Sequence, residues 1–236
     1  MKSVKKYIVL ALVLMVVLSV CLGCGKKTSE VEAIKKSGKL VILTNAEFAP
    51  YEYLGDDNQI VGVDMEIGQY IADELGVELQ IENMDFEGII AALAAGKGNL
   101  GIAGFSIDAD RLKAVDFSVE YATSAQYMIV AADNEDIKGA ADLVGKIIGA
   151  QSGTTGDYYA TDDVEDAEVM RYASAMEAAT ALMSGKLDVV IVDELTAQLI
   201  VQSNNDKLQM VEEKLTEESY AIAVNKKSDL LPVVDK

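Results

Sequence analysis

Two stretches of the chain, 89 residues apart, show the same order of residue types. In each stretch a helix-like run ends at a small residue followed by Gly-Lys, and an apolar strand-like run comes next; the stretches are 92–103 and 181–192. This match predicts two lobes built from one helix-and-strand unit. Such links also recur in unrelated α/β proteins, so a chance match is the alternative.

Short β-branched apolar runs alternate with helical runs along the whole chain, which predicts an α/β fold with a mostly parallel sheet covered by helices. Each expected helix is followed by glycine, and Ser174 with Glu177 forms a capping box for the last one. The expected helices cover 65–75, 87–95 and 175–184. Strands are expected at 40–44, 77–81, 100–103, 127–131, 146–149, 189–192, 208–211 and 220–224.

The first residues of the chain indicate its compartment. Three lysines precede the apolar run Tyr7–Leu22, which is interrupted only by Ser19 and is followed by Gly23-Cys24. This order predicts an export signal over residues 1–23. A membrane-spanning helix is the alternative, but it requires about 20 apolar residues.

Cys24 needs an explanation of its own, because Cys21 leaves with the signal and no disulfide can form in the mature chain. The segment from Cys21 to Cys24 resembles a bacterial lipobox, in which the last Cys receives a diacylglyceryl group, although Cys21 stands where Leu is usual. We therefore expect a lipid on Cys24, a tether over 24–30, and an extracytoplasmic protein anchored to the membrane. A stray small apolar residue is the alternative.

Composition excludes several kinds of partner. The formal charge is −19, and it becomes −22 once the three lysines of the signal are removed, which disfavours nucleic acid and anionic lipid surfaces. The chain has no His, and no Cys follows Cys24, so the commonest zinc, copper and thiol chemistries are excluded. We expect no cofactor and no metal, with carboxylate-only metal sites left open.

The two strands of the repeat end at corresponding residues, Gly104 and Asp193, and open α/β sheets bind ligands at that edge. Arg111 follows the first edge and is suited to gripping a carboxylate, unless it is a surface residue paired with Asp108 or Asp110. Asp193 is suited to accepting an ammonium group, unless it caps the helix that follows. Together the cation and the anion match the two charged ends of an α-amino acid, because either charge buried without a partner would cost several kcal/mol.

Two further features lie beside the same edges. The segment 150–156 follows an expected strand and precedes a helix, where exposed amides and hydroxyls attract anions; a plain turn is the alternative. Phe48 and Phe86 each follow an expected strand, so they either line a ligand pocket or cover the core.

Four motifs resemble, in their order and spacing, the family 3 extracellular solute-binding proteins, the polar amino-acid receptors of bacterial ABC importers. The resemblance extends from Gly38 to about Leu231. The motifs are Phe48–Tyr53, Gly62–Ile67, Ala103–Arg111 with Val115–Ser118, and Ser152–Gly156.

The resemblance implies a type II periplasmic-binding-protein-like fold, with two Rossmann-like lobes joined by hinge strands near 121–126 and 217–221. Lobe 1 would contain residues 31–121 and 220–236, and lobe 2 residues 122–219. Family members usually continue past the equivalent of Leu231 with a further helical segment, so we expect lobe 1 to be truncated at the C-terminus. Closure of the lobes would follow binding.

The resemblance also implies the function: a monomer that captures a polar amino acid, delivers it to an ABC permease and performs no catalysis. Family members that bind basic amino acids often carry Asp where this chain has Asn45, which weakens a preference for Lys or Arg. The alternative is a cyclohexadienyl or arogenate dehydratase on the same fold, with Glu47 or Glu194 as proton donor. The implied ligand-binding residues are Gly104, Ser106, Arg111, Thr154 and Thr155 for the carboxylate, Asp193 for the ammonium group, and Asn45, Phe48, Phe86 and Gln151 for the side chain.

Overall fold

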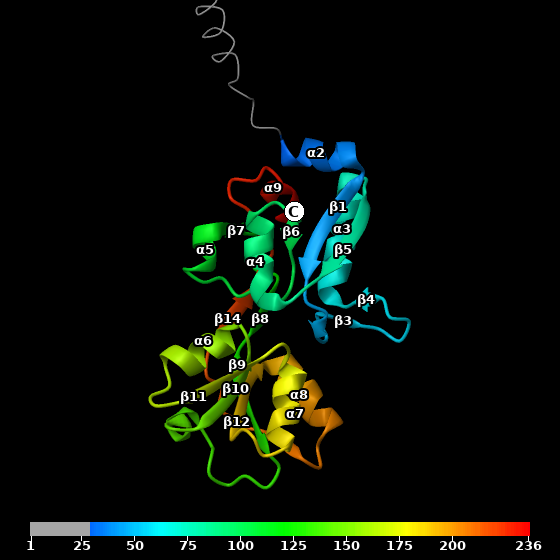
Figure 1. Cartoon of the computed structure of the whole chain (residues 1–236). Coiled ribbons are helices and arrows are strands. Elements are labelled where there is room, and N and C mark those ends of the chain that lie inside the picture. The colour runs from blue at the N-terminus through cyan, green and yellow to red at the C-terminus, as the bar shows by residue number, and fades with distance from the viewer. Residues whose placement is uncertain (1–28) are drawn as a thin grey trace, which may run out of the picture.

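The computed structural model describes residues 29–236, which form two lobes joined by a pair of strands (Figure 1). The expected signal and the expected lipid site at Cys24 lie outside the described residues. Within residues 29–236, no helix combines the length and the apolar character needed to cross a membrane. Ser29 caps α2 (Glu30–Ser37), so the first described helix begins at the last residue of the expected tether.

Lobe 1 is built on a five-stranded sheet with the order β5-β1-β6-β15-β7. Successive side chains of β1 point to opposite faces, so Ile42 packs with α3 while Leu43 packs with α4. The strands are β1 (Lys39–Thr44), β5 (Glu78–Asn83), β6 (Leu100–Gly101), β7 (Val115–Phe117) and β15 (Ala223–Asn225). The other helices of this lobe are α3 (Val63–Leu75), α4 (Phe86–Ala94), α5 (Arg111–Ala114) and α9 (Leu231–Val234), and a small sheet joins β2 (Glu47–Phe48), β3 (Glu52–Leu54) and β4 (Ile60–Val61).

Lobe 2 repeats this plan with the sheet order β11-β10-β12-β9-β13. One face of the sheet packs against α7 and α8, where Val190 and Val192 are buried, and the other packs against α6, where Ile191 is buried. The strands are β9 (Gln126–Ala131), β10 (Ile147–Gln151), β11 (Glu168–Tyr172), β12 (Val189–Asp193) and β13 (Leu208–Met210). The helices are η1 (Ala140–Leu143), α6 (Thr155–Asp162), α7 (Ala175–Met183) and α8 (Glu194–Ser203).

The predicted helices at 65–75, 87–95 and 175–184 are confirmed as α3, α4 and α7, with ends within two residues of those expected. The Ser174 hydroxyl accepts a hydrogen bond from the Glu177 amide at 3.1 Å, as the capping pattern predicts. The expectation of a mostly parallel sheet is confirmed, since four of the five strands in each large sheet run in the same direction and only β15 or β9 is reversed. In each large sheet two neighbouring pairs are parallel and two are antiparallel, because β9 and β15 enter from the hinge and run against the strands that point toward it.

The expected single strand at 220–224 is wrong, because this run divides between two strands that belong to different sheets. β14 (Glu218–Tyr220) pairs antiparallel with β8 (Ala122–Ser124) in the hinge, and β15 then enters lobe 1. The run 220–224 is buried throughout, so its apolar pattern contained no sign of the break.

Candidate functional site

A cavity lies between the lobes, at the carboxyl ends of the strands that point toward the hinge. Its volume in this closed arrangement is about 20 Å³, which is far smaller than a typical small-molecule site. The structure brings all ten predicted ligand-binding residues to this cavity, together with Ala103, which was not predicted. The lining residues are Asn45, Phe48, Phe86, Ala103, Gly104, Ser106, Arg111, Gln151, Thr154, Thr155 and Asp193.

Gly104 lies at the turn after β6, where only a glycine fits. Its φ is +54°, and a Cβ atom there would lie 2.5 Å from Cε1 of Phe48. Its amide donates to Oδ2 of Asp64 at 3.1 Å, so this N–H is already used within the protein. Gly104 therefore allows the backbone to pass close to the Phe48 ring, but its N–H group is not free to bind a ligand.

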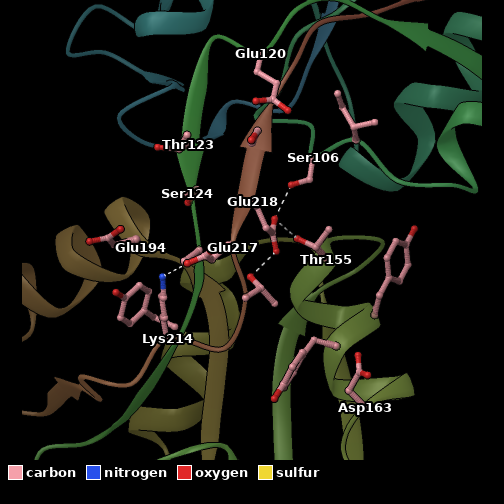
Figure 2. Close-up of a pocket in the computed structure, with 17 residues that line it drawn as sticks. Ser106, Glu120, Thr123, Ser124, Thr155, Asp163, Glu194, Lys214, Glu217 and Glu218 are labelled. Atoms are coloured by element: carbon pink, nitrogen blue, oxygen red, sulfur yellow. Dashed lines mark hydrogen bonds and ion pairs between the residues drawn. The ribbon is translucent and has the colours of Figure 1, made fainter.

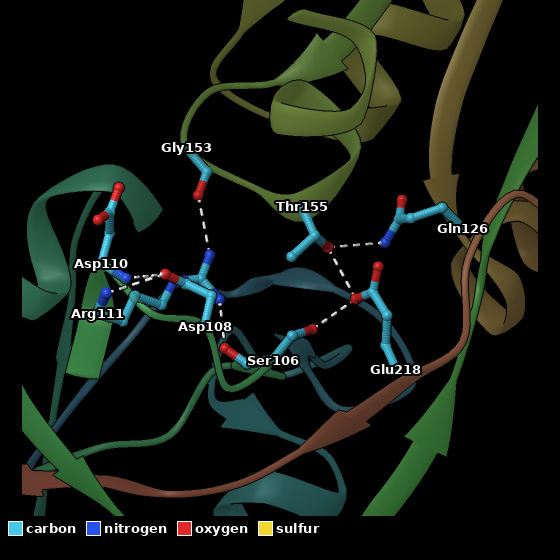
Figure 3. Close-up of polar contacts among 8 residues, drawn as sticks. All are labelled: Ser106, Asp108, Asp110, Arg111, Gln126, Gly153, Thr155 and Glu218. Atoms are coloured by element: carbon cyan, nitrogen blue, oxygen red, sulfur yellow. Dashed lines mark hydrogen bonds and ion pairs between the residues drawn. The ribbon is translucent and has the colours of Figure 1, made fainter. Parts of the chain in front are cut away.

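Arg111 is 7% exposed and stands at the boundary between the lobes, where its guanidinium donates in two directions (Figure 3). Nη1 donates to the Ser106 carbonyl at 2.7 Å, and Nη2 donates across the cleft to the Gly153 carbonyl at 3.0 Å. Nε lies 3.0 Å from Oδ2 of Asp108, so the ion pair considered in the sequence is present, but the guanidinium is buried. The rings of Phe86, Phe105 and Tyr158 lie 5.2 to 5.9 Å from it, which leaves a fixed cation at the cavity wall.

Asp193 is the last residue of β12 and is 8% exposed. Its side chain makes no capping bond to α8, and Oδ1 instead accepts the hydroxyl of Tyr220 from the hinge. Burial and the nearby negative charge of Glu218 raise the pKa of Asp193 to about 6. A cationic group in the cavity would relieve this cost.

The segment after β10 does form the start of a helix, as predicted. The Thr154 hydroxyl accepts the Asp157 amide at 3.3 Å and donates to the Gln151 carbonyl at 2.8 Å, so it caps α6. Thr155 is the first residue of α6, and its hydroxyl donates to Glu218 at 2.8 Å. The amides of Ser152, Gly153 and Thr154 are already bonded within lobe 2, and Thr154 and Thr155 line the cavity from this side.

Two amide side chains meet across the cleft at the far side of the cavity. Nε2 of Gln151 donates to Oδ1 of Asn45 at 2.9 Å, and Nδ2 of Asn45 donates to the Met84 carbonyl at 3.0 Å. Phe48 stacks on Tyr51 with ring centroids 5.5 Å apart, so it belongs both to the cavity wall and to a small aromatic cluster. Phe48 therefore lines the cavity and also covers part of the core, so the two interpretations offered by the sequence are compatible.

A buried pair of carboxyl groups, Glu52 and Asp64, supports the Gly104 turn from below. Glu52 is fully buried, and burial together with the charge of Asp64 raises its pKa well above its usual 4.5. Asp64 accepts the Gly104 amide and, at 3.0 Å, the hydroxyl of Tyr121 from the hinge. No sequence pattern marks Glu52 and Asp64 as a pair, although they stand in the motifs Phe48–Tyr53 and Gly62–Ile67.

Glu218 and Tyr220 were not predicted as site residues. Glu218 contacts Ser106 and Tyr220 contacts Asp193, and no sequence pattern relates residues so far apart in the chain. The acids considered as proton donors for a dehydratase do not reach the cavity. Glu47 is exposed, and Glu194 lines a separate hollow at the hinge (Figure 2). Neither belongs to the cavity lining in the described part of the chain.

Known proteins resemble this chain both in sequence and in fold. A family model of the bacterial extracellular solute-binding proteins, family 3, matches residues 40–231. The arginine-binding extracellular protein ArtP of Bacillus subtilis (strain 168) is 32% identical over 223 residues, which cover 91% of this chain and 84% of ArtP. The L-cystine-binding protein TcyJ of Escherichia coli (strain K12) is 30% identical over 204 residues, which cover 86% of this chain and 77% of TcyJ.

A solved structure supports the same assignment. The arginine-bound form of truncated ArgBP from T. maritima matches with a TM-score of 0.83 and 36% identity, covering 86% of this chain and 96% of ArgBP. The predicted type II periplasmic-binding-protein fold is confirmed by this match. The chain belongs to the bacterial extracellular solute-binding proteins, family 3.

Proposed function

We propose that this protein captures a polar α-amino acid between its lobes and delivers it to the permease of an ABC importer. The observation that carries the proposal is the placement of Arg111 and Asp193 on one cavity, the first from lobe 1 and the second from lobe 2. A zwitterion satisfies both groups at once, because its carboxylate pairs with the guanidinium and its ammonium group with the buried carboxylate. Binding therefore favours the closed arrangement of the lobes.

The side chain of the ligand would lie toward Asn45 and Gln151, between Phe48 and Phe86. These residues offer amide donors and acceptors and two aromatic surfaces, which suit a polar or planar side chain. Relatives named as arginine-binding and cystine-binding support a polar amino acid, and L-arginine is the first probe to use.

Isothermal titration calorimetry against the twenty amino acids and L-cystine tests the proposal. We expect one-to-one binding of at least one of them, and loss of roughly 100-fold or more in affinity for Arg111→Ala, because a buried charge-assisted contact is removed. Lysine at position 113 provides a matched control, since Lys113→Ala removes an exposed cation outside the cavity. Absence of heat with every ligand would refute the amino-acid assignment.

We also propose that the protein binds without catalysing a reaction. The support is that Glu47 and Glu194, the two acids considered as proton donors, are not among the described residues that line the cavity. Incubation with prephenate and arogenate, followed by ultraviolet absorbance of the aromatic product, tests this. Turnover above the uncatalysed rate would restore the enzyme hypothesis.

The remaining proposals concern anchoring and organisation. We infer a lipid on Cys24 and an anchored monomer outside the cytoplasm, with lobe 1 at 31–121 and 220–236 and lobe 2 at 122–219. Mass spectrometry of the membrane fraction should find a diacylglyceryl group on the wild-type protein and none on Cys24→Ser. A secreted, unmodified wild-type protein would contradict the anchor, and light scattering would reveal any oligomer.

A further inference from the structure

Glu218 lies on hinge strand β14 and collects hydroxyl groups from both lobes (Figures 2 and 3). Its Oε2 accepts from Ser106 of lobe 1 at 2.5 Å and from Thr155 of lobe 2 at 2.8 Å. Its Oε1 accepts from Thr216, next to the hinge, at 2.8 Å. One carboxylate thus joins three parts of the protein.

Gln126 fixes the direction of two of these hydrogen bonds. Its Nε2 donates to the Thr155 hydroxyl at 3.1 Å, and its backbone amide donates to the Thr216 hydroxyl at 2.9 Å. Each hydroxyl therefore accepts from Gln126 and has its own proton directed to Glu218. An ionised carboxylate accepts and cannot donate, so Glu218 matches this set of donors in its charged form.

Glu218 lies outside the ligand cavity, on the far side of two residues that line it. Ser106 and Thr155 line both the cavity and a hollow of about 810 Å³ at the hinge, whereas Glu218 lines only the hollow. The carboxylate therefore touches the ligand cavity only through these two hydroxyls, and its charge also acts on Asp193.

The three-way contact requires the lobes to be closed. Ser106 stays with β14, because a backbone bridge pairs it with Tyr220. Thr155 belongs to α6 of lobe 2, so rotation of the lobes carries its hydroxyl away from Glu218 beyond hydrogen-bond distance. Closure thus adds a charge-assisted hydrogen bond to a hinge residue that Ser106 already ties to lobe 1.

We propose that Glu218 is a positioning residue for closure: held beside lobe 1 by Ser106, it receives Thr155 as the lobes close and slows release of the bound amino acid. The identity of the ligand rests on the proposed function, but the effect on closure does not. A competing arrangement, in which Glu218 occupies hydroxyls that the ligand carboxylate needs, would have the opposite effect on affinity.

Release of L-arginine, measured by stopped-flow tyrosine fluorescence, distinguishes the two arrangements. For Glu218→Gln we expect release roughly tenfold faster with association unchanged, since a charged acceptor becomes neutral. The matched control is Glu217→Gln, which loses the same charge at an exposed neighbour that pairs only with Lys214 in the described contacts. Unchanged release, or tighter binding, in Glu218→Gln would overturn the proposal.

A double-mutant cycle separates this role from a general loss of stability. If Glu218 acts through Thr155, then Glu218→Gln should no longer speed release in a Thr155→Val background. Additive effects of the two substitutions would overturn the proposal. Thermal unfolding of both variants shows whether they are folded.

Small-angle X-ray scattering of the ligand-free full chain tests closure without any ligand. The radius of gyration of Glu218→Gln should exceed that of the wild type, while Glu217→Gln should match the wild type. Equal radii for all three proteins would overturn the proposal. A wild-type protein that binds no amino acid would refute the proposed function alone, and the scattering result would still decide the role of Glu218.

Discussion

Replacing Asp193 with asparagine should stabilise the ligand-free protein and impair its binding. The carboxyl group has a pKa of about 6 in the folded protein, against an ordinary value of 3.8. A raised pKa means that the folded state holds the proton more tightly than the unfolded state does. The stability that this group contributes is therefore present below 3.8 and is lost as the pH rises through about 6.

The magnitude follows from the size of the shift. About two pKa units correspond to at most about 3 kcal/mol of unfolding free energy lost at neutral pH, which Asp193→Asn should restore. For a chain of this size the gain would raise Tm by roughly 6–12 °C. The asparagine Oδ1 can still accept the hydroxyl of Tyr220, so the hinge contact is kept. Affinity for the amino acid should fall roughly 100-fold or more, because the ammonium group loses its partner.

Calorimetric unfolding of the ligand-free proteins at about pH 7.5 and about pH 5 is the assay. The advantage of Asp193→Asn over the wild type should shrink by roughly half at the lower pH, because the wild-type carboxyl becomes protonated there. Glu194→Gln, which loses a charge at the adjacent residue outside the cavity, is the matched control for the loss of one negative charge. The reasoning would be refuted if Asp193→Asn were no more stable than the wild type, or if the difference in their unfolding free energies did not change with pH. Either result would show that the charged form of Asp193 does not destabilise the folded protein.

Three other substitutions test separate parts of the site. Arg111→Lys keeps the charge but loses the planar fork, so calorimetry should show L-arginine binding weaker by roughly 100-fold; affinity near that of the wild type would contradict the proposed grip. Gly104→Ala places a Cβ atom against Phe48 at a positive φ. A denaturant titration should therefore show the unfolding free energy lowered by roughly 1–3 kcal/mol. An unchanged unfolding free energy would show that the turn relaxes to accept the methyl group. Glu52→Gln removes a carboxyl group whose pKa is raised well above 4.5. Because a group with a raised pKa destabilises the folded wild type as the pH rises, the unfolding free energy of the variant relative to the wild type should increase between about pH 5 and pH 8. A difference in unfolding free energy that does not change with pH would argue against a protonated Glu52 beside Asp64.

The local pattern of the sequence predicted where helices end, but it did not predict the direction of every strand or find every strand. The end of α3 was set by Gly76, which adopts the left-handed conformation that glycine favours, and a stop of this kind is visible in the sequence alone. The direction of β9 and β15 was not visible, because antiparallel entry follows from the chain crossing the hinge. The strand β11 was missed for another reason: its residues from Glu168 to Tyr172 are only partly buried, so no apolar run marks it.

The candidate site divides in the same way. Arg111 and Asp193 could be predicted, because each stands just beyond a strand end and the sheet edge brings such residues together. Glu218 could not, since its contacts depend on how the lobes close, and its partner Ser106 is 112 residues away in the chain. Residues whose role depends on contacts between separate units leave no periodic signal in either unit.

The central position of β15 in the sheet of lobe 1 also governs the order in which the chain can fold. β15 lies between β6 and β7, so this sheet stays divided until residues 223–225 have been synthesised. The sheet of lobe 2 draws only on residues 126–210, and all of its strands are available earlier. A chain emerging from its N-terminus can therefore complete the second lobe first, while the first lobe waits for the last strand.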